Sequence, residues 1–124
     1  CMGGRVAFQA ALEHGIGAAV SFYGGGIAAP HPVGWSALGG RAAELRAPVL
    51  AIFGDADHTI AVDDVEAWRP VLATAPVATD IVRYAEAGHG FHCDARGAYH
   101  AEAARDAWAR TQAWLDRFVP ATPA

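Results

Sequence analysis

The 124-residue sequence predicts an α/β protein with about three parallel strands and flanking helices. Short apolar runs that are typical of buried strands alternate along the chain with longer segments of helical periodicity. Because 53% of the residues are hydrophobic, one domain of this length can bury a substantial core. The alternation of helix and strand is typical of a parallel sheet in which helices connect successive strands.

The first predicted helix spans residues 2–14, and Gly15 is placed to end it. Its sequence, MGGRVAFQAALEH, carries apolar side chains that predict a buried helix: Val6, Phe8, Ala10, Ala11 and Leu12. The apolar run IGAAVSFYGGG then predicts a strand at about residues 17–23 that is buried on both faces. A loop rich in proline and glycine follows, and the short polar segment RAAELR after it is either helix or loop.

The second half of the chain continues the alternation. The stretch APVLAIFGDAD predicts a buried strand at about residues 48–53. Residues 62–74 predict an amphipathic helix with acidic side chains in its first turn. The run TDIVRYAEA predicts a strand at about residues 79–85. The last predicted helix runs from about residue 99 to residue 118, with several alanines, Trp108, Trp114 and Leu115 on its inner side.

Composition and charge exclude several classes of protein. The net charge is −4, and the nine basic residues are all arginines scattered along the chain, which argues against nucleic-acid binding. No apolar run approaches the roughly 18 residues of a membrane span, so we expect no membrane partner. The two cysteines, Cys1 and Cys93, are too few for a disulfide framework or a zinc cage, and a cytoplasmic location is the default expectation.

Three loops carry residues that could do chemistry. In parallel α/β sheets the reactive residues lie on loops beyond the carboxyl ends of the strands. Cys1 precedes the first helix, GDADHT follows the second strand, and EAGHGFHCD follows the third. Taken alone, an aspartate turn or a histidine between glycines is more often structural than functional. Together, Cys, Asp and His occur in the order of nucleophile, acid and base in α/β-hydrolases.

The three loops lie within three of the following four longer stretches: CMGGRVAF, SFYGGGI, PVLAIFGDADHTI and YAEAGHGFHCDARGAYHAEAARDAWARTQAWLDRF. In this order they resemble the dienelactone hydrolase (carboxymethylenebutenolidase) family. The first stretch is similar to the second half of a nucleophile elbow of the form Gly-x-Cys-x-Gly-Gly. The resemblance implies that residues 1–124 are the C-terminal part of an α/β-hydrolase fold that starts at the nucleophile, with the upstream half absent.

The resemblance implies that Cys1 is the nucleophile. A cysteine at the N-terminus of a helix is stabilised as the thiolate, and Gly3 and Gly4 would let the helix approach the sheet closely. The backbone N–H of Met2 would supply one oxyanion donor, and a second donor would come from an upstream loop. The alternative for Cys1 is a small buried thiol of the core.

His89 is the expected base, because it lies between two glycines directly after a strand, whereas His92 is expected to flank the site. For the acid, Asp57 is preferred to Asp55, because Gly54, Asp57 and Ile60 fit the spacing of the family. Asp57 would hold the imidazole in the correct tautomer, and Asp55 would cap the turn.

The implied reaction is the hydrolysis of a small-molecule ester or lactone through a thioester intermediate, with no metal or organic cofactor. In dienelactone hydrolase itself, an arginine four residues after the catalytic histidine helps to hold the carboxylate of the substrate. That position is Cys93 here, and the nearest arginine is Arg96. This difference from the family does not change the expected reaction, the hydrolysis of an ester or lactone. It leaves the identity of the substrate undetermined.

Other interpretations remain open. The chain could be an incomplete or non-catalytic fragment that acts only with a partner segment, and its exposed sheet edge would favour self-association. Cys1 could be an N-terminal nucleophile whose own α-amine serves as the base, or Cys1 and Cys93 could form a ligand-binding or redox module. Four aromatic side chains could line a pocket or belong to the core: Tyr23, Trp35, Trp68 and Phe91.

Overall fold

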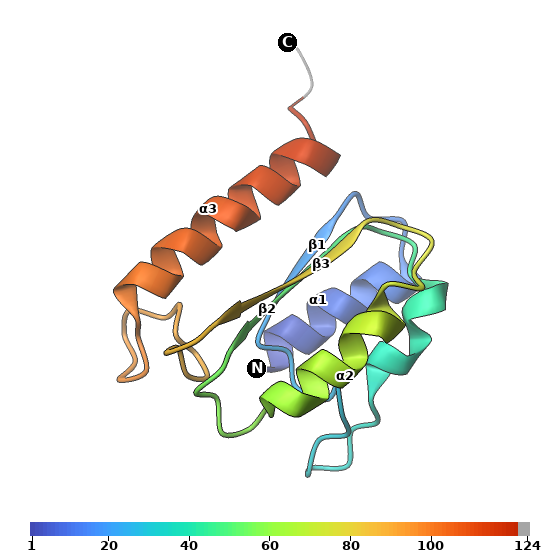
Figure 1. Cartoon of the computed structure of the whole chain (residues 1–124). Helices are drawn as coiled ribbons and strands as arrows, with labels where there is room; N and C mark the ends of the chain where they lie inside the picture. The colour runs from blue at the N-terminus through green and yellow to red at the C-terminus, as the bar shows by residue number, and fades with distance from the viewer. Residues whose placement is uncertain (122–124) are drawn as a thin grey trace.

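A parallel sheet between two layers of helices forms the centre of the molecule (Figure 1). The computed structural model describes residues 1–121. The elements in chain order are α1 (Met2–Glu13), β1 (Ala19–Phe22), the 3₁₀ helix η1 (Leu38–Glu44), β2 (Val49–Gly54), α2 (Val62–Leu72), β3 (Thr79–Tyr84) and α3 (Ala101–Phe118). The strand order is β1-β2-β3, and both neighbouring pairs are parallel. The predicted fold class is therefore confirmed.

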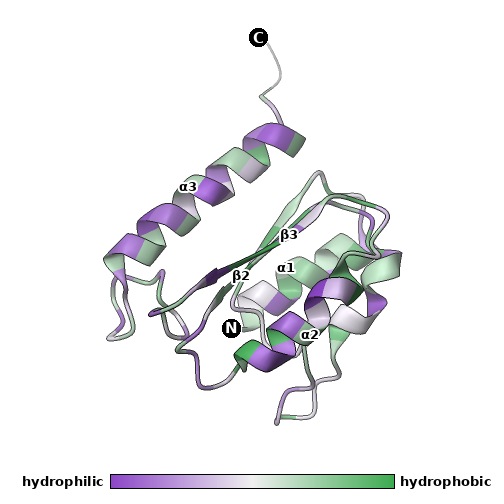
Figure 2. Ribbon diagram, viewed as in Figure 1, coloured by the Kyte–Doolittle hydropathy of each residue, from purple (hydrophilic) through white to green (hydrophobic). Residues whose placement is uncertain are grey.

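The central strand β2 is buried along its whole length, as its apolar run predicts. Because side chains alternate across a strand, Val49, Ala51 and Phe53 pack in the core that lies against α1 and α2. Leu50 and Ile52 pack on the opposite face, in the core shared with α3. Figure 2 shows the green, hydrophobic colouring of β2 between the two layers.

The edge strand β1 differs from the prediction. Ala19 and Ser21 are buried, but Val20 and Phe22 are only partly buried. The latter two lie on the α3 face of the sheet, which α3 covers incompletely at this strand. The expectation that this strand is buried on both faces was therefore wrong for the α3 face.

Helix α1 lies unusually close to β1 at one glycine. A Cβ atom on Gly4 would lie 2.3 Å from the carbonyl oxygen of Phe22, so any larger residue would push the helix away. The Ser21 hydroxyl also donates a 2.8 Å hydrogen bond to the carbonyl of Gly4. Gly3 has open space around it, so the close approach expected at both glycines occurs only at Gly4.

The inner side of α3 is built from small residues: Ala103, Ala104, Ala107 and Thr111. The sequence predicts Trp108 and Leu115 on that side, but Trp108 is 50% exposed and Leu115 is 38% exposed. Only Trp114 of the three large side chains packs against the core. The alanine face points inward because small side chains let the helix lie close to the sheet. On α1, Val6 likewise faces outward rather than into the core.

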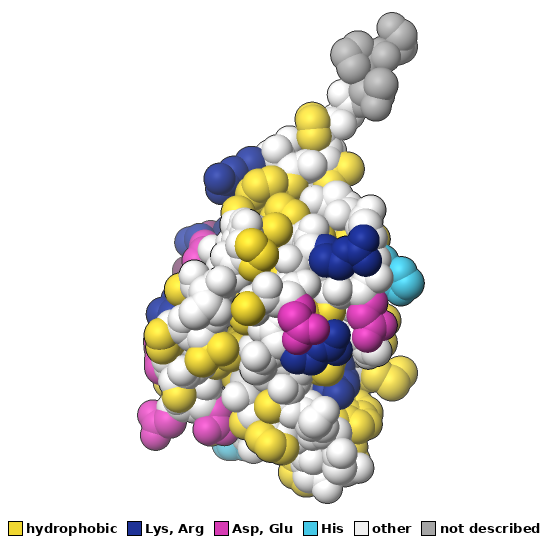
Figure 3. Space-filling model, turned by 90° about the vertical axis from the view of Figure 1, so that its right-hand side faces the viewer, with side chains coloured by type: hydrophobic (Ala, Val, Ile, Leu, Met, Phe, Trp, Pro, Cys, Tyr) yellow, Lys and Arg dark blue, Asp and Glu magenta, His cyan; other side chains and the backbone are white. Residues whose placement is uncertain are grey.

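The surface mixes charges of both signs with apolar side chains. Figure 3 shows this mixture on the face that lies to the right in Figure 1. Among the helices of residues 1–121, none combines the length and the apolar character that crossing a membrane requires.

Candidate active site

Two loops meet where β2 and β3 end. The backbone N–H of Asp55 donates to the carbonyl of Tyr84 at 2.9 Å, and the N–H of Ala56 donates to the carbonyl of Ala87 at 2.9 Å. A Cβ atom on Gly54 would lie 2.2 Å from the carbonyl oxygen of Ala87, so only glycine permits this approach. Backbone contacts thus join the two loops that carry Asp57 and His89.

Asp57 and His89 form the polar centre of this loop pair. His89 Nδ1 and Asp57 Oδ2 lie 2.6 Å apart. The Asp57 side chain is 1% exposed, and the His89 side chain is 26% exposed. An ionised carboxylate can only accept hydrogen bonds, so Nδ1 must carry the proton and the neutral ring keeps Nε2 free to accept one. This contact is the one that the loop sequences predict.

Thr59 completes the coordination of the Asp57 carboxylate. Asp57 Oδ1 accepts hydrogen bonds from the Thr59 backbone N–H at 2.7 Å and from the Thr59 hydroxyl at 2.6 Å. Burial raises the pKa of Asp57, but the hydrogen bonds from Thr59, together with His89, outweigh it and leave the pKa below its usual value. Sequence reasoning missed Thr59, although Asp-x-Thr is a spacing at which an aspartate side chain bonds the backbone two residues on.

Tyr23 lies between the loop pair and the start of α1. Its backbone φ of 38° is in the left-handed region, which is uncommon for a bulky residue. The ring centroid lies 5.0 Å from that of His89, and the carbonyl oxygen accepts a hydrogen bond from the backbone nitrogen of Cys1. Of the four aromatic candidates for pocket lining, Tyr23, Trp68 and Phe91 are buried and Trp35 is partly buried. Tyr23 is the one whose ring contacts His89.

Cys1 is the N-cap residue of α1, and Met2 is the first residue of the helix. In the described chain Cys1 is exposed. It lines a hollow of about 410 Å³ together with Tyr23, His92, Cys93 and Arg96. Within residues 1–121, no hydrogen bond joins the Cys1 thiol to His89.

His92, which was expected to flank the site, and Arg96 also line this hollow. His92 lies between two rings, with centroid distances of 4.9 Å to Phe22 and 5.9 Å to Trp108. Arg96 lines the hollow that Cys1 also lines, so a positive charge is present there although Cys93 occupies the family's arginine position. In the part of the chain that the structure describes, no three His, Cys, Asp or Glu side chains gather as a metal site would need.

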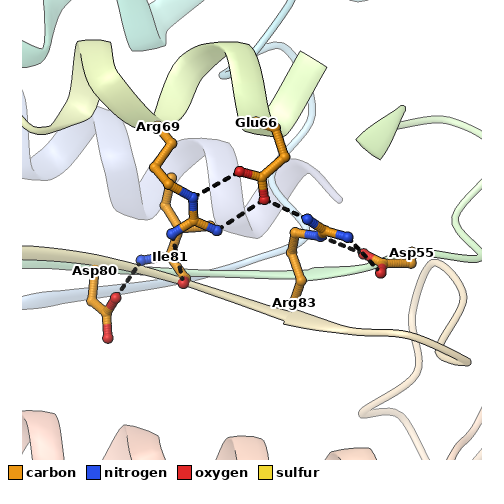
Figure 4. Close-up of polar contacts among 6 residues, drawn as sticks. All are labelled: Asp55, Glu66, Arg69, Asp80, Ile81 and Arg83. Carbon is orange, nitrogen blue, oxygen red and sulfur yellow. Dashed lines mark hydrogen bonds and ion pairs between the residues drawn. The ribbon is translucent and has the colours of Figure 1, made fainter. Parts of the chain in front are cut away.

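Asp55 does not cap its turn as expected. Its carboxylate forms a two-point ion pair with Arg83 of β3, at 2.8 Å to Nε and 2.9 Å to a terminal nitrogen (Figure 4). Arg83 also pairs with Glu66 of α2, which in turn pairs with Arg69 at 2.8 Å. The hydrogen bonds from Arg69 and Arg83 lower the pKa of Glu66 to about 2. These four side chains, Asp55, Arg83, Glu66 and Arg69, are called the ion network below.

The fold and the loop pair define the class of protein. A parallel sheet with flanking helices, carrying an acid and a histidine on the loops after two neighbouring strands, is the architecture of an α/β-hydrolase. The crystal structure of a putative dienelactone hydrolase from Klebsiella pneumoniae superposes with a TM-score of 0.84 and 36% identity, over 95% of this chain and 50% of that one. The Pyrococcus horikoshii acylaminoacyl peptidase superposes with a TM-score of 0.75 at 16% identity, which is a likeness of fold alone.

Sequence comparison narrows the class to one family. The model of the dienelactone hydrolase family matches residues 1–119. The chain therefore belongs to this family. It is 36% identical over 125 residues to a "Putative carboxymethylenebutenolidase" of Methylorubrum extorquens and 37% identical over 122 residues to one of Yersinia pestis. The matches cover 95% and 93% of this chain but only 41% and 43% of those proteins. The chain therefore spans less than half the length of these relatives.

Proposed function

We propose that the protein containing this sequence hydrolyses carboxylic esters or lactones with Cys1 as nucleophile, His89 as general base and acid, and Asp57 as the group that orients His89. The observation that supports this proposal most is the 2.6 Å hydrogen bond between Asp57 Oδ2 and His89 Nδ1 at the carboxyl end of the sheet. Membership of the dienelactone hydrolase family supports the hydrolytic chemistry. Because the chain spans less than half the length of its relatives, the activity is proposed for the whole protein.

The proposed reaction has two halves. His89 Nε2 takes the proton of Cys1, and the thiolate sulfur attacks the ester carbonyl carbon. The carbon–oxygen bond of the leaving group breaks, the leaving alkoxide takes the proton from His89, and a thioester remains on Cys1. His89 then takes a proton from water, and the resulting hydroxide attacks the thioester carbonyl carbon. The carbon–sulfur bond breaks, the acid leaves, and the Cys1 thiolate takes the proton back from His89. Asp57 stabilises the imidazolium in both halves.

The start of α1 suits the charge that develops on the carbonyl oxygen. Met2 is the first residue of the helix, and the N–H groups of a first helical turn have no partner within the helix. Its N–H is therefore proposed as one oxyanion donor, with a second donor elsewhere in the protein.

The nucleophile is tested in the full protein with nitrophenyl acetate as substrate. Cys1→Ala removes the covalent step and should lower kcat/KM by several orders of magnitude, because members of such a catalytic unit act together. Alkylation by iodoacetamide should abolish activity in the wild type and equally in Cys93→Ala. Cys93→Ala, which removes the other thiol of the hollow, is the matched control and should retain near-normal activity. Full activity of Cys1→Ala would overturn the proposal.

A further inference from the structure

Three side chains close a small ring of hydrogen bonds at the candidate site. Asp57 Oδ1 accepts from the Thr59 hydroxyl at 2.6 Å, and Asp57 Oδ2 accepts from His89 Nδ1 at 2.6 Å. The Thr59 hydroxyl oxygen itself lies 3.3 Å from His89 Nδ1. Thr59 is thus in contact with both members of the acid–base pair.

The direction of each hydrogen bond follows from the chemistry of the groups. The ionised carboxylate of Asp57 has no proton to give, so the Thr59 hydroxyl and His89 Nδ1 must both donate to it. With its only proton directed to Oδ1, the Thr59 oxygen presents lone pairs to Nδ1–H as a second, weaker acceptor. The hydroxyl therefore occupies one carboxylate oxygen and leaves the other for His89.

We propose that Thr59 is a positioning residue, whose hydroxyl holds the Asp57 carboxylate in the orientation in which Oδ2 meets His89 Nδ1. Its effect on turnover rests on the proposed function, whereas its effect on the Asp57–His89 hydrogen bond does not depend on Cys1. A charge-assisted hydrogen bond of this length is stronger than a neutral one. Its loss leaves Oδ1 with one hydrogen bond, from the Thr59 backbone N–H, and so weakens the hold on the carboxylate orientation. Thr59 is exposed, so replacing it should cost the fold little.

Thr59→Val tests this in the full protein, because it removes the hydroxyl and preserves the shape and the backbone N–H. We expect kcat for nitrophenyl acetate to fall roughly tenfold, the scale of one hydrogen bond to a charged group, with KM unchanged. Thr59→Ser keeps the hydroxyl and should restore kcat to within about twofold of the wild type. In proton NMR, the downfield Nδ1–H signal of His89 should move upfield and exchange faster with water in Thr59→Val only.

Thr74→Val is the matched control. Thr74 is another exposed threonine, and its hydroxyl donates to the carbonyl of Val71 at 2.7 Å beyond the end of α2, away from the loop pair. This variant should leave kcat and the His89 signal as in the wild type.

The outcomes separate the two proposals. If Thr59→Val leaves both kcat and the His89 signal unchanged while Cys1→Ala abolishes activity, the positioning role is wrong and the proposed function stands. If Cys1→Ala keeps full activity, the proposed function is wrong, and the His89 signal alone decides on Thr59: a shift in Thr59→Val supports the positioning role, and no shift overturns it.

Discussion

Asp55 and Asp57 lie two residues apart on one turn and contact different partners. Asp57 meets His89 and Thr59, whereas Asp55 meets Arg83 in the ion network. The two carboxylates therefore differ in chemistry: one accepts a hydrogen bond from an imidazole, and the other pairs with a guanidinium that stays charged.

Substitution of the two aspartates should separate these roles. Asp57→Asn places an amide against His89, favours the wrong tautomer and should lower kcat by about 10⁴-fold, the effect known for the equivalent change in a serine protease. Asp55→Asn should lower kcat far less, because Arg83 keeps its pairing with Glu66. Steady-state kinetics on nitrophenyl acetate measures both. Equal losses in the two variants would show that the acid is wrongly assigned.

The sequence predicted that the loops carrying Asp57 and His89 meet, because the carboxyl ends of neighbouring parallel strands lie at one edge of the sheet. The preference for Asp57 over Asp55 came from the spacing of the family that the sequence resembles. It did not predict the pairing of Asp55 with Arg83, which lies 28 residues away and depends on the register that places Phe53 beside Arg83. Thr59 was missed for another reason. A threonine in a polar turn looks the same in sequence whether its hydroxyl meets water or a buried carboxylate.

At the scale of elements, the contact between α1 and β1 sets where Cys1 stands. Gly4 is the third residue of the helix, and its approach to the Phe22 carbonyl brings the helix start next to Tyr23. A side chain at Gly4 would therefore move the helix that Cys1 caps. The neighbouring Gly3 faces open space and carries no such constraint.

Gly4→Ala should destabilise the protein by about 1–3 kcal/mol, the usual cost of overpacking a close contact. Gly3→Ala is the matched control, and it should raise the free energy of unfolding by up to about 1 kcal/mol, because alanine is the better helix former. Urea denaturation of the two variants measures this difference. A Gly4→Ala protein as stable as the wild type would contradict the close packing of α1 on β1.

Apolar patterning predicted the strands and helices better than it predicted which way a helix faces. The apolar residues of β2 are buried on both faces of the sheet, as the sequence predicted for this strand. On α3, a count of apolar area favours Trp108 inward, yet Ala103 and Ala107 face the sheet. The distance between helix and sheet decides which side of α3 faces inward, and the sequence alone does not give that distance.

At the scale of the whole molecule, the ion network joins α2, β3 and the turn after β2 (Figure 4). Through Glu66, this network should make the free energy of unfolding decrease as the pH is lowered. Hydrogen bonds from Arg69 and Arg83 lower the pKa of Glu66 from 4.5 to about 2 on folding. A group whose folded pKa is lowered stabilises the fold above its unfolded pKa and loses that effect as pH falls toward the folded value.

The melting temperature should therefore fall as the pH is lowered from about 5 toward 2, and protonation of Asp57, whose pKa is also lowered, acts in the same direction. Thermal unfolding followed by circular dichroism at several pH values measures this. Glu66→Gln should show a shallower decline over the same range. An unchanged decline in Glu66→Gln would mean that the network does not contribute.

The polypeptide of 124 residues, prepared alone, should associate in a concentration-dependent way. Within residues 1–121, β1 pairs with β2 only, and an unpaired strand edge is a site for pairing between chains. Three exposed apolar side chains add to this tendency: Met2, Val6 and Trp108. Size-exclusion chromatography with light scattering should find dimers or larger species, and a monomer at all concentrations would be the contrary result.

The backbone contacts that join the two loops have a consequence for how the site can change by mutation. Backbone hydrogen bonds and Gly54 assemble the acid and the histidine within residues 54–89, and no residue of α1 takes part. Under the proposed function, a change of the residue at position 1 would therefore replace the attacking atom and leave the Asp57–His89 hydrogen bond in place.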